Sequence, residues 1–238
     1  MNPFSKIKAL YKGQQEVLNL MREIEWAHIF HDSIRGNKPI EELALNIGRW
    51  AGNYSFFYVL NRILSEYKPA KILDLGLGES SKLISVYLNH LLANSSHVIV
   101  EHDLAWIDSF NARFSLTDRS TLIHCPLKKI QINGFDSFSY DRFEERVNER
   151  FDLYIVDGPF GSDRFSRYNI MSLVSQFDVH DEFIIIMDDT NRQGEGDTLE
   201  AIKEALRKKG ILFFSDNYVG NKTNSLIVTK KYKNATSY

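Results

Sequence analysis

The chain has 238 residues, and its 29 basic and 31 acidic residues leave a formal net charge of -2. This balance excludes a global electrostatic field for nucleic acid or for an anionic membrane, so any charged partner must be bound locally. The single cysteine, Cys125, excludes an internal disulfide framework and a cysteine-built metal site. The sequence shows no signal-peptide hydrophobic region and no apolar run of about 20 residues, which predicts a cytoplasmic protein without a membrane span.

The first part of the chain is predicted to be helical. One helix is expected over about residues 14–30, where apolar residues recur at helical intervals, and a second over about 41–67, interrupted near Gly48 or Gly52. The second region is more apolar than a lone surface helix needs, so we expect it to pack on the sheet. A homo-oligomer formed through the N-terminal helices is one assembly that this pattern allows. The predicted division is an N-terminal helical extension or lid over 1–67 and a core domain over 68–238.

The core region alternates between predicted strands and helices. Such alternation implies right-handed crossovers and a mainly parallel sheet. The polar stretch 131–150 is predicted as an insertion with one short helix over about 140–148. Strands are expected at 71–75, 98–101, 120–124, 151–157 and 182–188, and helices at 80–93, 104–114, 167–177 and 198–208.

Two further strand-like runs, 211–215 and 225–229, end the predicted sheet. The connection between them is too short for a crossover helix, so the two runs must pair antiparallel or leave the sheet. A dinucleotide dehydrogenase would instead continue with another strand and helix or with a substrate domain. The tail therefore predicts a terminal antiparallel hairpin and argues against a dehydrogenase.

A glycine turn follows the first predicted strand. Asp74 lies near the end of that apolar run, Gly76 and Gly78 turn the chain without a Cβ, and a helix is predicted from Ser80. A nucleotide-like ligand could lie against this turn, although an ordinary tight turn between strand and helix also needs such glycines. The second strand ends at Glu101, about where a ribose-binding carboxylate belongs after a crossover helix. Together the turn and the second acid predict a nucleotide site.

The glycine turn, the second-strand acid and the terminal hairpin together resemble class I S-adenosylmethionine-dependent methyltransferases, over about residues 55–230. The resemblance implies an α/β, Rossmann-like sheet with S-adenosylmethionine as cofactor and with Glu101 on the ribose hydroxyls. Ser80 stands where the family has a third glycine, and His124-Cys125-Pro126 offers no acid after the third strand, which leaves the adenine contacts unassigned. The residues that the resemblance places along the cofactor are Asp74, Gly76, Gly78, Ser80, Glu101 and Asp157.

Aspartates close the fourth and fifth predicted strands. Asp157 ends the fourth strand, and Asp188 ends the fifth with Asp189 beside it. This pattern resembles the divalent-metal site of Mg²⁺-dependent O-methyltransferases, particularly those acting on sugars, and the segment 157–161 resembles a loop of the glucuronic-acid O-methyltransferases of plant xylan. Neighbouring strands lie about 4.8 Å apart, so carboxylates at their ends would meet and need a cation or a shared proton. Asp189 joins them only if the strand has already ended, because successive strand side chains point to opposite faces.

The same aspartates also have ordinary structural interpretations. Asp157-Gly158 is a common turn sequence, and Asp189 or Thr190 could cap the following helix. In related sugar enzymes an acid two residues after the strand-four aspartate acts as the base, whereas here that position is Pro159. The group that takes the hydroxyl proton is therefore left open: either Asp163 is the base, or activation by the metal suffices without one.

Three arginines lie in the two loops that overlook this edge of the sheet: Arg164, Arg167 and Arg192. Guanidinium groups bind carboxylate or phosphate through two parallel hydrogen bonds, so an acidic sugar such as a uronate, or a phosphorylated acceptor, would suit them. Alternatively, they are solvated loop cations that pair with Asp163 or Glu195. The acceptor is thus expected to be small or a glycan precursor, and it could be anionic.

The sequence predicts a S-adenosylmethionine-dependent O-methyltransferase, assisted by a divalent metal, that acts on a sugar or glycan-precursor hydroxyl. Asp157, Asp188 and Asp163 are its predicted catalytic residues, and Asp157, Asp188 and Asp189 its predicted Mg²⁺ ligands. Two alternatives remain open at this point: a metal-independent small-molecule methyltransferase, and a non-catalytic binding protein that keeps the cofactor fold.

Overall fold

A seven-stranded sheet organises the protein. The computed structural model describes residues 3–238, and its strand order is β3-β2-β1-β6-β7-β9-β8. The first five strands of this order are parallel, β9 is antiparallel to β7, and β8 is antiparallel to β9. The prediction of an α/β fold with a mainly parallel sheet and a terminal antiparallel hairpin is confirmed. The strands are β1 (Lys71–Leu75), β2 (Ser96–Glu101), β3 (Ser120–His124), β6 (Leu153–Val156), β7 (Ile184–Met187), β8 (Phe213–Val219) and β9 (Thr223–Thr229).

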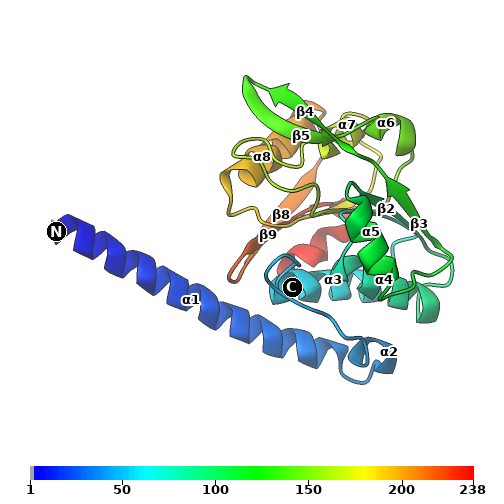
Figure 1. Ribbon diagram of the computed structural model, residues 1–238, viewed down its shortest axis with the longest axis horizontal. Coiled ribbons are helices and arrows are strands. Elements are labelled where there is room, and N and C mark those ends of the chain that lie inside the picture. Colours follow the sequence, from blue (N-terminus) through cyan, green and yellow to red (C-terminus); the bar gives the residue numbers. More distant parts are fainter. Residues whose placement is uncertain (1–2) are drawn as a thin grey trace.

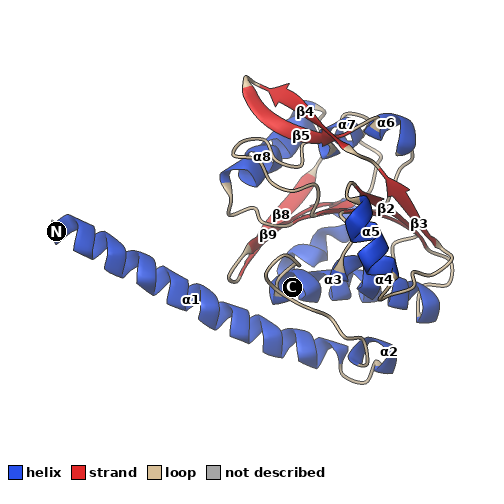
Figure 2. Ribbon diagram, in the orientation of Figure 1, coloured by secondary structure: helices blue, strands red, loops and turns tan. Residues whose placement is uncertain are grey.

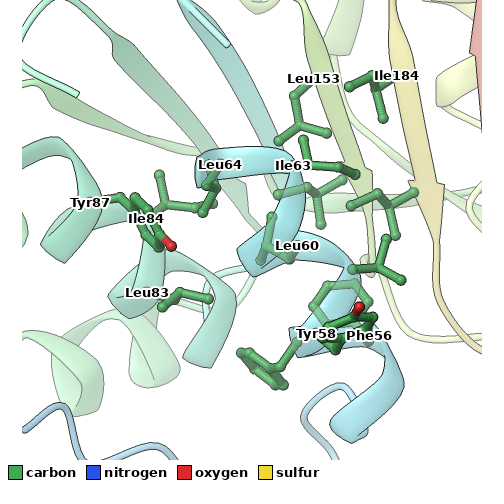
Figure 3. Close-up of a cluster of buried hydrophobic side chains, with 14 of the residues drawn as sticks. Phe56, Tyr58, Leu60, Ile63, Leu64, Leu83, Ile84, Tyr87, Leu153 and Ile184 are labelled. Carbon is green, nitrogen blue, oxygen red and sulfur yellow. The ribbon is translucent and has the colours of Figure 1, made fainter. Parts of the chain in front are cut away.

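Helices cover both faces of the sheet (Figure 2). One buried cluster joins α3 and α4 to alternate strand residues such as Leu153 and Ile184, as Figure 3 shows, and α5 packs in a smaller cluster. A second large cluster joins α6, α7 and α8 to the intervening strand residues, including Tyr154 and Ile185. Burial on both faces explains why the central strands read as nearly continuous apolar runs. The helices are α3 (Tyr54–Glu66), α4 (Glu79–His90), α5 (Leu104–Asn111), α6 (Phe143–Arg146), α7 (Ile170–Val174) and α8 (Gln193–Lys208).

The N-terminal helices differ from the predicted ones. The first helix, α1, runs over Pro3–Ile34 rather than 14–30, and α2 is a single turn over Lys38–Glu41. The predicted helix at 41–67 forms only from Tyr54, because Gly48 takes the left-handed φ of +94° and the Asn53 side chain caps α3 by accepting from the Phe56 N–H at 3.2 Å. The N-terminal part of α1 extends away from the rest of the molecule (Figure 1).

The polar insertion predicted at 131–150, with one short helix, also contains strands that were not predicted. It begins with a two-stranded hairpin of β4 (Leu127–Ile132) and β5 (Phe135–Tyr140), which pairs separately from the main sheet. Asn133 and Gly134 make its turn with φ values of +51° and +83°. Asn-Gly is the strongest short-range hairpin signal, since both central residues of a type I′ turn need positive φ. The short helix α6 follows close to where a helix was expected.

The C-terminal segment that follows β9 packs on the body of the protein. The 3₁₀ helix η1 (Lys230–Ser237) buries Tyr232 and Ala235 against the cluster that contains α3. Over residues 3–238, no helix combines the length and the apolar character needed to cross a membrane.

Candidate functional site

The glycine turn lies where β1 meets α4, at the carboxyl edge of the sheet. Gly76 has a φ of +115°, and a Cβ at this position would lie 3.2 Å from the Gly158 backbone nitrogen, so both its conformation and its close approach to the neighbouring chain require glycine. A Cβ at Gly78 would meet no atom within 4 Å. The chain's own packing therefore leaves open space beside Gly78, which fits a turn against which a ligand lies.

Asp74 is completely buried behind this turn. Its Oδ2 accepts hydrogen bonds from the hydroxyls of Ser80 at 2.9 Å and Ser81 at 2.7 Å, which fixes the first turn of α4 to the strand. Its Oδ1 has no hydrogen-bond partner. Ser80, which stands where a third glycine was expected, thus orders the turn through its hydroxyl.

Glu101 ends β2 next to the glycine turn. Its Oε2 accepts from the Leu77 N–H at 3.0 Å, and its Oε1 accepts from the N–H groups of His102 at 2.6 Å and Asp103 at 2.9 Å. Burial alone would raise its pKa, but the contacts with His102, Asp103 and Leu77 outweigh burial and hold the pKa of Glu101 below its ordinary value. Glu101 is therefore an ionised acceptor at the end of β2, in the position predicted for ribose binding.

Three aspartates meet at the same edge of the sheet, at the ends of β6 and β7. The strands β6 and β7 pair with Val156 opposite Met187, Asp157 follows β6, and Asp188 and Asp189 follow β7. One carboxylate oxygen from each aspartate lies within 4.8 Å of the others. Asp189 shares this cluster because β7 ends at Met187 and the left-handed φ of +61° at Asp189 turns the chain. The structure therefore brings together all three predicted metal ligands.

The carboxylates of this cluster are short of hydrogen-bond donors. Both oxygens of Asp188 and the Oδ1 of Asp189 are buried without a hydrogen-bond partner. Burial and the charge of Asp188 raise the pKa of Asp157 well above its ordinary value, and burial and the charge of Asp189 raise that of Asp188. The cluster is thus a set of carboxyl groups whose joint ionisation is unfavourable without added positive charge, which fits an oxygen-ligated divalent cation.

One buried and one partly buried cation from the chain itself lie close to these carboxylates. Arg167 is 3% exposed, and its Nη2 lies 2.9 Å from Asp189 Oδ2 and 3.3 Å from Asp157 Oδ1. Its Nη1 donates to the backbone carbonyls of Asp188 at 2.9 Å and Val156 at 3.3 Å. Lys222 Nζ lies 3.6 Å from Asp188 Oδ2 and 3.4 Å from Asp189 Oδ1, beyond good hydrogen-bond distance. Arg167 therefore clamps both strand ends, and Lys222 supplies a looser positive charge.

The remaining predicted site residues lie farther out. Arg164 forms an ion pair with Asp197 and stacks over Phe135, with its guanidinium carbon 4.6 Å from the ring centroid. Arg192 is half exposed, and its Nη1 lies 3.1 Å from Asp189 Oδ2. Asp163 is exposed on the loop after β6 and is not part of the aspartate cluster. Of the three arginines predicted to bind the acceptor, Arg192 thus presents the most open guanidinium at the cluster.

Two members of this site were not predicted as such, Lys222 and Glu195. Lys222 lies in the turn between β8 and β9. Because β9 runs antiparallel to β7 with Ser225 opposite Met187, the residues just before Ser225 pass the end of β7. The predicted antiparallel hairpin was therefore a signal that its turn lies near the aspartates. Glu195 is fully buried in α8, with its Oε1 3.9 Å from Arg167 Nε and 3.8 Å from Arg192 Nη1. The sequence had suggested Glu195 only as a partner for solvated arginines.

A cleft of about 770 Å³ lies between α8 and the β8–β9 hairpin. Its lining includes the polar side chains of Thr190, Gln193, Asn217 and Thr223, apolar side chains of α7 and α8, and the aromatic ring of Tyr168. It borders the aspartate cluster through Thr190, which follows Asp189, but no residue of the glycine turn lines it. The cleft and the glycine turn are therefore separate features of this edge.

Comparison with known proteins identifies the fold. No family model and no curated protein matches the chain. Among solved structures, the O-methyltransferase from Bacillus cereus in complex with S-adenosylhomocysteine has a TM-score of 0.51 at 15% identity, with 85% of this chain and 91% of that chain covered. The O-methyltransferase TomG from Streptomyces achromogenes, in complex with S-adenosylmethionine, has a TM-score of 0.51 at 12% identity, with 86% and 88% covered.

A putative caffeoyl-CoA O-methyltransferase from Staphylococcus aureus is also similar, with a TM-score of 0.50, 11% identity, and 83% of this chain and 91% of that chain covered. These likenesses, together with the observed strand order, show that the chain has the class I methyltransferase fold. At such low identities they establish the fold alone, and the activity has to be argued from the site.

Proposed function

We propose that this protein is a S-adenosylmethionine-dependent O-methyltransferase that uses a divalent cation ligated by Asp157, Asp188 and Asp189. The observation that supports the metal site is that both carboxylate oxygens of Asp188 are buried without a hydrogen-bond partner. A buried, unpaired carboxylate is costly, and its nearest cation, Lys222, lies 3.6 Å away. Hard divalent cations prefer clustered carboxylate oxygens of this kind, so the residues present fit the ion.

The cofactor is proposed to lie along the glycine turn, beside Gly78 and Glu101. The open space next to Gly78 admits a ligand close to the backbone, and the lowered pKa of Glu101 keeps its carboxylate ionised as an acceptor for two ribose hydroxyls. Gly76 and Gly158 are in contact, which brings the turn next to the residue that follows Asp157. The proposed cofactor site and the aspartate cluster are therefore neighbours along the carboxyl edge of the sheet.

The chain's residues would have separate roles in methyl transfer. S-adenosylmethionine supplies the electrophilic methyl group, and a divalent cation supplies positive charge that orients an acceptor hydroxyl and lowers its pKa. Arg167 holds the two strand ends together, which fixes the distance between Asp157 and Asp189. Asp163, exposed on the loop after β6, stays the candidate that accepts the hydroxyl proton.

The acceptor is proposed to be a sugar or glycan-precursor hydroxyl on a molecule with an anionic group. Arg192 supports the anionic group, since it is half exposed at the cluster edge. The cleft that begins at Thr190 supports a hydroxyl-rich acceptor, because its amide and hydroxyl side chains can exchange hydrogen bonds with sugar hydroxyls and Tyr168 offers a ring. Arg167 is buried against the aspartates, and Arg164 donates to both carboxylate oxygens of Asp197, so we give neither a direct part in acceptor binding.

Metal-independent methyl transfer is the second candidate, and a specific observation favours it. Arg167 and Lys222 already place two positive charges against the cluster, and Arg192 adds a third at its edge. Four carboxylates, those of the three aspartates and Glu195, face these three cations. If the native cations suffice, the cluster serves as a structural ion network and the acceptor is activated by a base alone.

Chelation separates the two candidates. With a panel of uronates, sugar phosphates and neutral sugars as acceptors, release of S-adenosylhomocysteine should stop after EDTA treatment and return with Mg²⁺ or Mn²⁺. Calorimetric titration should show that EDTA leaves the affinity for S-adenosylhomocysteine largely unchanged, because Glu101 and the glycine turn do not ligate the ion. Full turnover after exhaustive chelation would support the metal-independent alternative, and a protein that binds the cofactor but methylates no acceptor would support the non-catalytic one.

The proposed ribose contact gives a separate prediction for the cofactor. Glu101→Gln is nearly isosteric but loses the charge, so S-adenosylhomocysteine should bind more weakly by roughly 1.5–3 kcal/mol for each charged hydrogen bond lost. Calorimetry measures this directly. Asp108→Asn, which removes an exposed carboxylate on α5, is the matched control and should bind as the wild type does. Equal affinity in both variants would remove the ribose role of Glu101.

A further inference from the structure

The long helix α1 has one face that packs on the body of the protein. Near its C-terminal end, Phe30 and Ile34 are buried in the cluster that contains α3, and the Trp26 indole N–H donates to the Val219 carbonyl at 3.0 Å. The 32 residues of α1 make a helix about 48 Å long at 1.5 Å per residue. Its N-terminal part extends beyond the body (Figure 1). This packed face accounts for only the C-terminal part of the helix.

A second apolar face runs along the other side of α1. Five large side chains on it are 56–68% exposed: Ile7, Leu10, Val17, Met21 and Ile24. Their spacings of three, seven, four and three residues keep them on one stripe, since residues three or four apart share a helix face. At 100° per residue, this stripe lies opposite the side that carries Trp26 and Phe30. Tyr11, Leu18 and Leu20 are also exposed and flank the stripe.

We propose that this outer face of α1 pairs with the same face of a second copy of the chain, in antiparallel orientation, to form a homodimer. A monomer rarely exposes so long an apolar stripe, even one with a polar residue within it, here Gln14. Each buried apolar side chain removes on the order of 100 Å² from water, so the stripes of two copies would together bury on the order of 1,000 Å², the lower limit for a specific interface. With Gln14 in the seven-residue gap between Leu10 and Val17, the stripe follows three- and four-residue steps, a spacing that suits two packed helices.

The charges of α1 favour the antiparallel arrangement. Between residues 6 and 12 every charged residue is a lysine. Between residues 16 and 25, Glu23 binds the body of the protein, and the remaining charged residues are two acidic ones, Glu16 and Glu25, and one basic one, Arg22. Antiparallel pairing places the lysine-bearing end of one helix beside the acidic part of the other, and parallel pairing would place like charges together. A helix that lies on an anionic membrane needs basic residues along its polar face, which the acidic part opposes. A second copy is therefore the better partner.

The dimer can be tested by sedimentation equilibrium over a roughly hundredfold range of protein concentration. The wild type should approach twice the monomer mass, and Met21→Glu should raise the dimer dissociation constant by at least about tenfold, because it buries a charge within the stripe. Gln15→Glu adds the same charge at an exposed position away from the stripe and should leave the dimer intact. Circular dichroism should confirm equal helix content in all three proteins.

The orientation can be tested with single cysteines, since the native Cys125 is buried. In an antiparallel pair, Ile7→Cys and Ile24→Cys chains should cross-link mainly to each other when mixed under oxidising conditions. Cross-linking of each variant mainly to itself would overturn the antiparallel arrangement. A wild type that stays monomeric at every concentration would overturn the dimer, as would helix-dependent binding to anionic phospholipid vesicles by a protein that shows no self-association. None of these outcomes depends on whether the chain transfers methyl groups.

Discussion

Asp188→Asn is expected to weaken Mg²⁺ binding and to lower the rate of methyl transfer by at least about 100-fold, with little change in cofactor affinity. Asp188 is the fully buried member of the aspartate cluster, and neither of its oxygens has a hydrogen-bond partner. An asparagine keeps the shape and one oxygen but loses the charge that attracts the cation. Titration calorimetry with Mg²⁺, and initial rates at saturating S-adenosylmethionine, measure the two effects separately.

Asp163→Asn is the matched control for this variant. Asp163 is exposed and lies outside the cluster, so its neutralisation should leave Mg²⁺ affinity unchanged. If Asp163 accepts the hydroxyl proton, its variant should lower the rate alone, which separates a base from a metal ligand. Wild-type Mg²⁺ affinity in Asp188→Asn would contradict the metal site and leave the aspartates as part of a structural ion network.

The sheet could be predicted because its signals are local. The five parallel strands are short, largely apolar runs, and the terminal runs had no room between them for a crossover helix. The start of α8 could not be placed as well: it was expected at Thr198 but begins at Gln193. Gly194 and Gly196 fall within its first turn, and their low helix propensity concealed the start of the helix. Tertiary packing overrides this low propensity. The β4–β5 hairpin had a clear Asn-Gly signal that its polar composition masked.

The part of the candidate site that lies at the strand ends could be predicted from the sequence. Asp157 and Asp188 meet because parallel neighbours end at one edge, a consequence of strand order alone. The ion partners depend on side chains from loops whose paths the sequence does not determine. Arg167, for example, has a left-handed φ of +57°, which no pattern around it predicts, and this conformation accompanies a guanidinium that turns inward toward the carboxylates instead of outward toward an acceptor.

Arg167→Met is expected to destabilise the protein by about 3–5 kcal/mol, the usual cost of removing one partner from a buried ion network. Burial disfavours the charge of Arg167, but the carboxylates of Asp157, Asp189 and Asp188 outweigh burial and raise its pKa, so the guanidinium stays charged. Methionine has a similar length and no charge, and it leaves the carboxylates without their strongest partner. Urea unfolding in the presence of EDTA measures the loss.

Arg164→Met is the matched control, because Arg164 forms its ion pair on the partly exposed side of α8, and its removal should cost much less. Arg167→Lys should recover only part of the stability, since a lysine keeps the charge but has one nitrogen in place of the two with which the guanidinium binds the backbone carbonyls and Asp189. Mg²⁺ should stabilise Arg167→Met more than it stabilises the wild type, because the variant's cluster has lost one native cation and retains its three proposed metal ligands. Equal Mg²⁺ stabilisation of both proteins would show that Arg167 and the ion do not share the same carboxylates.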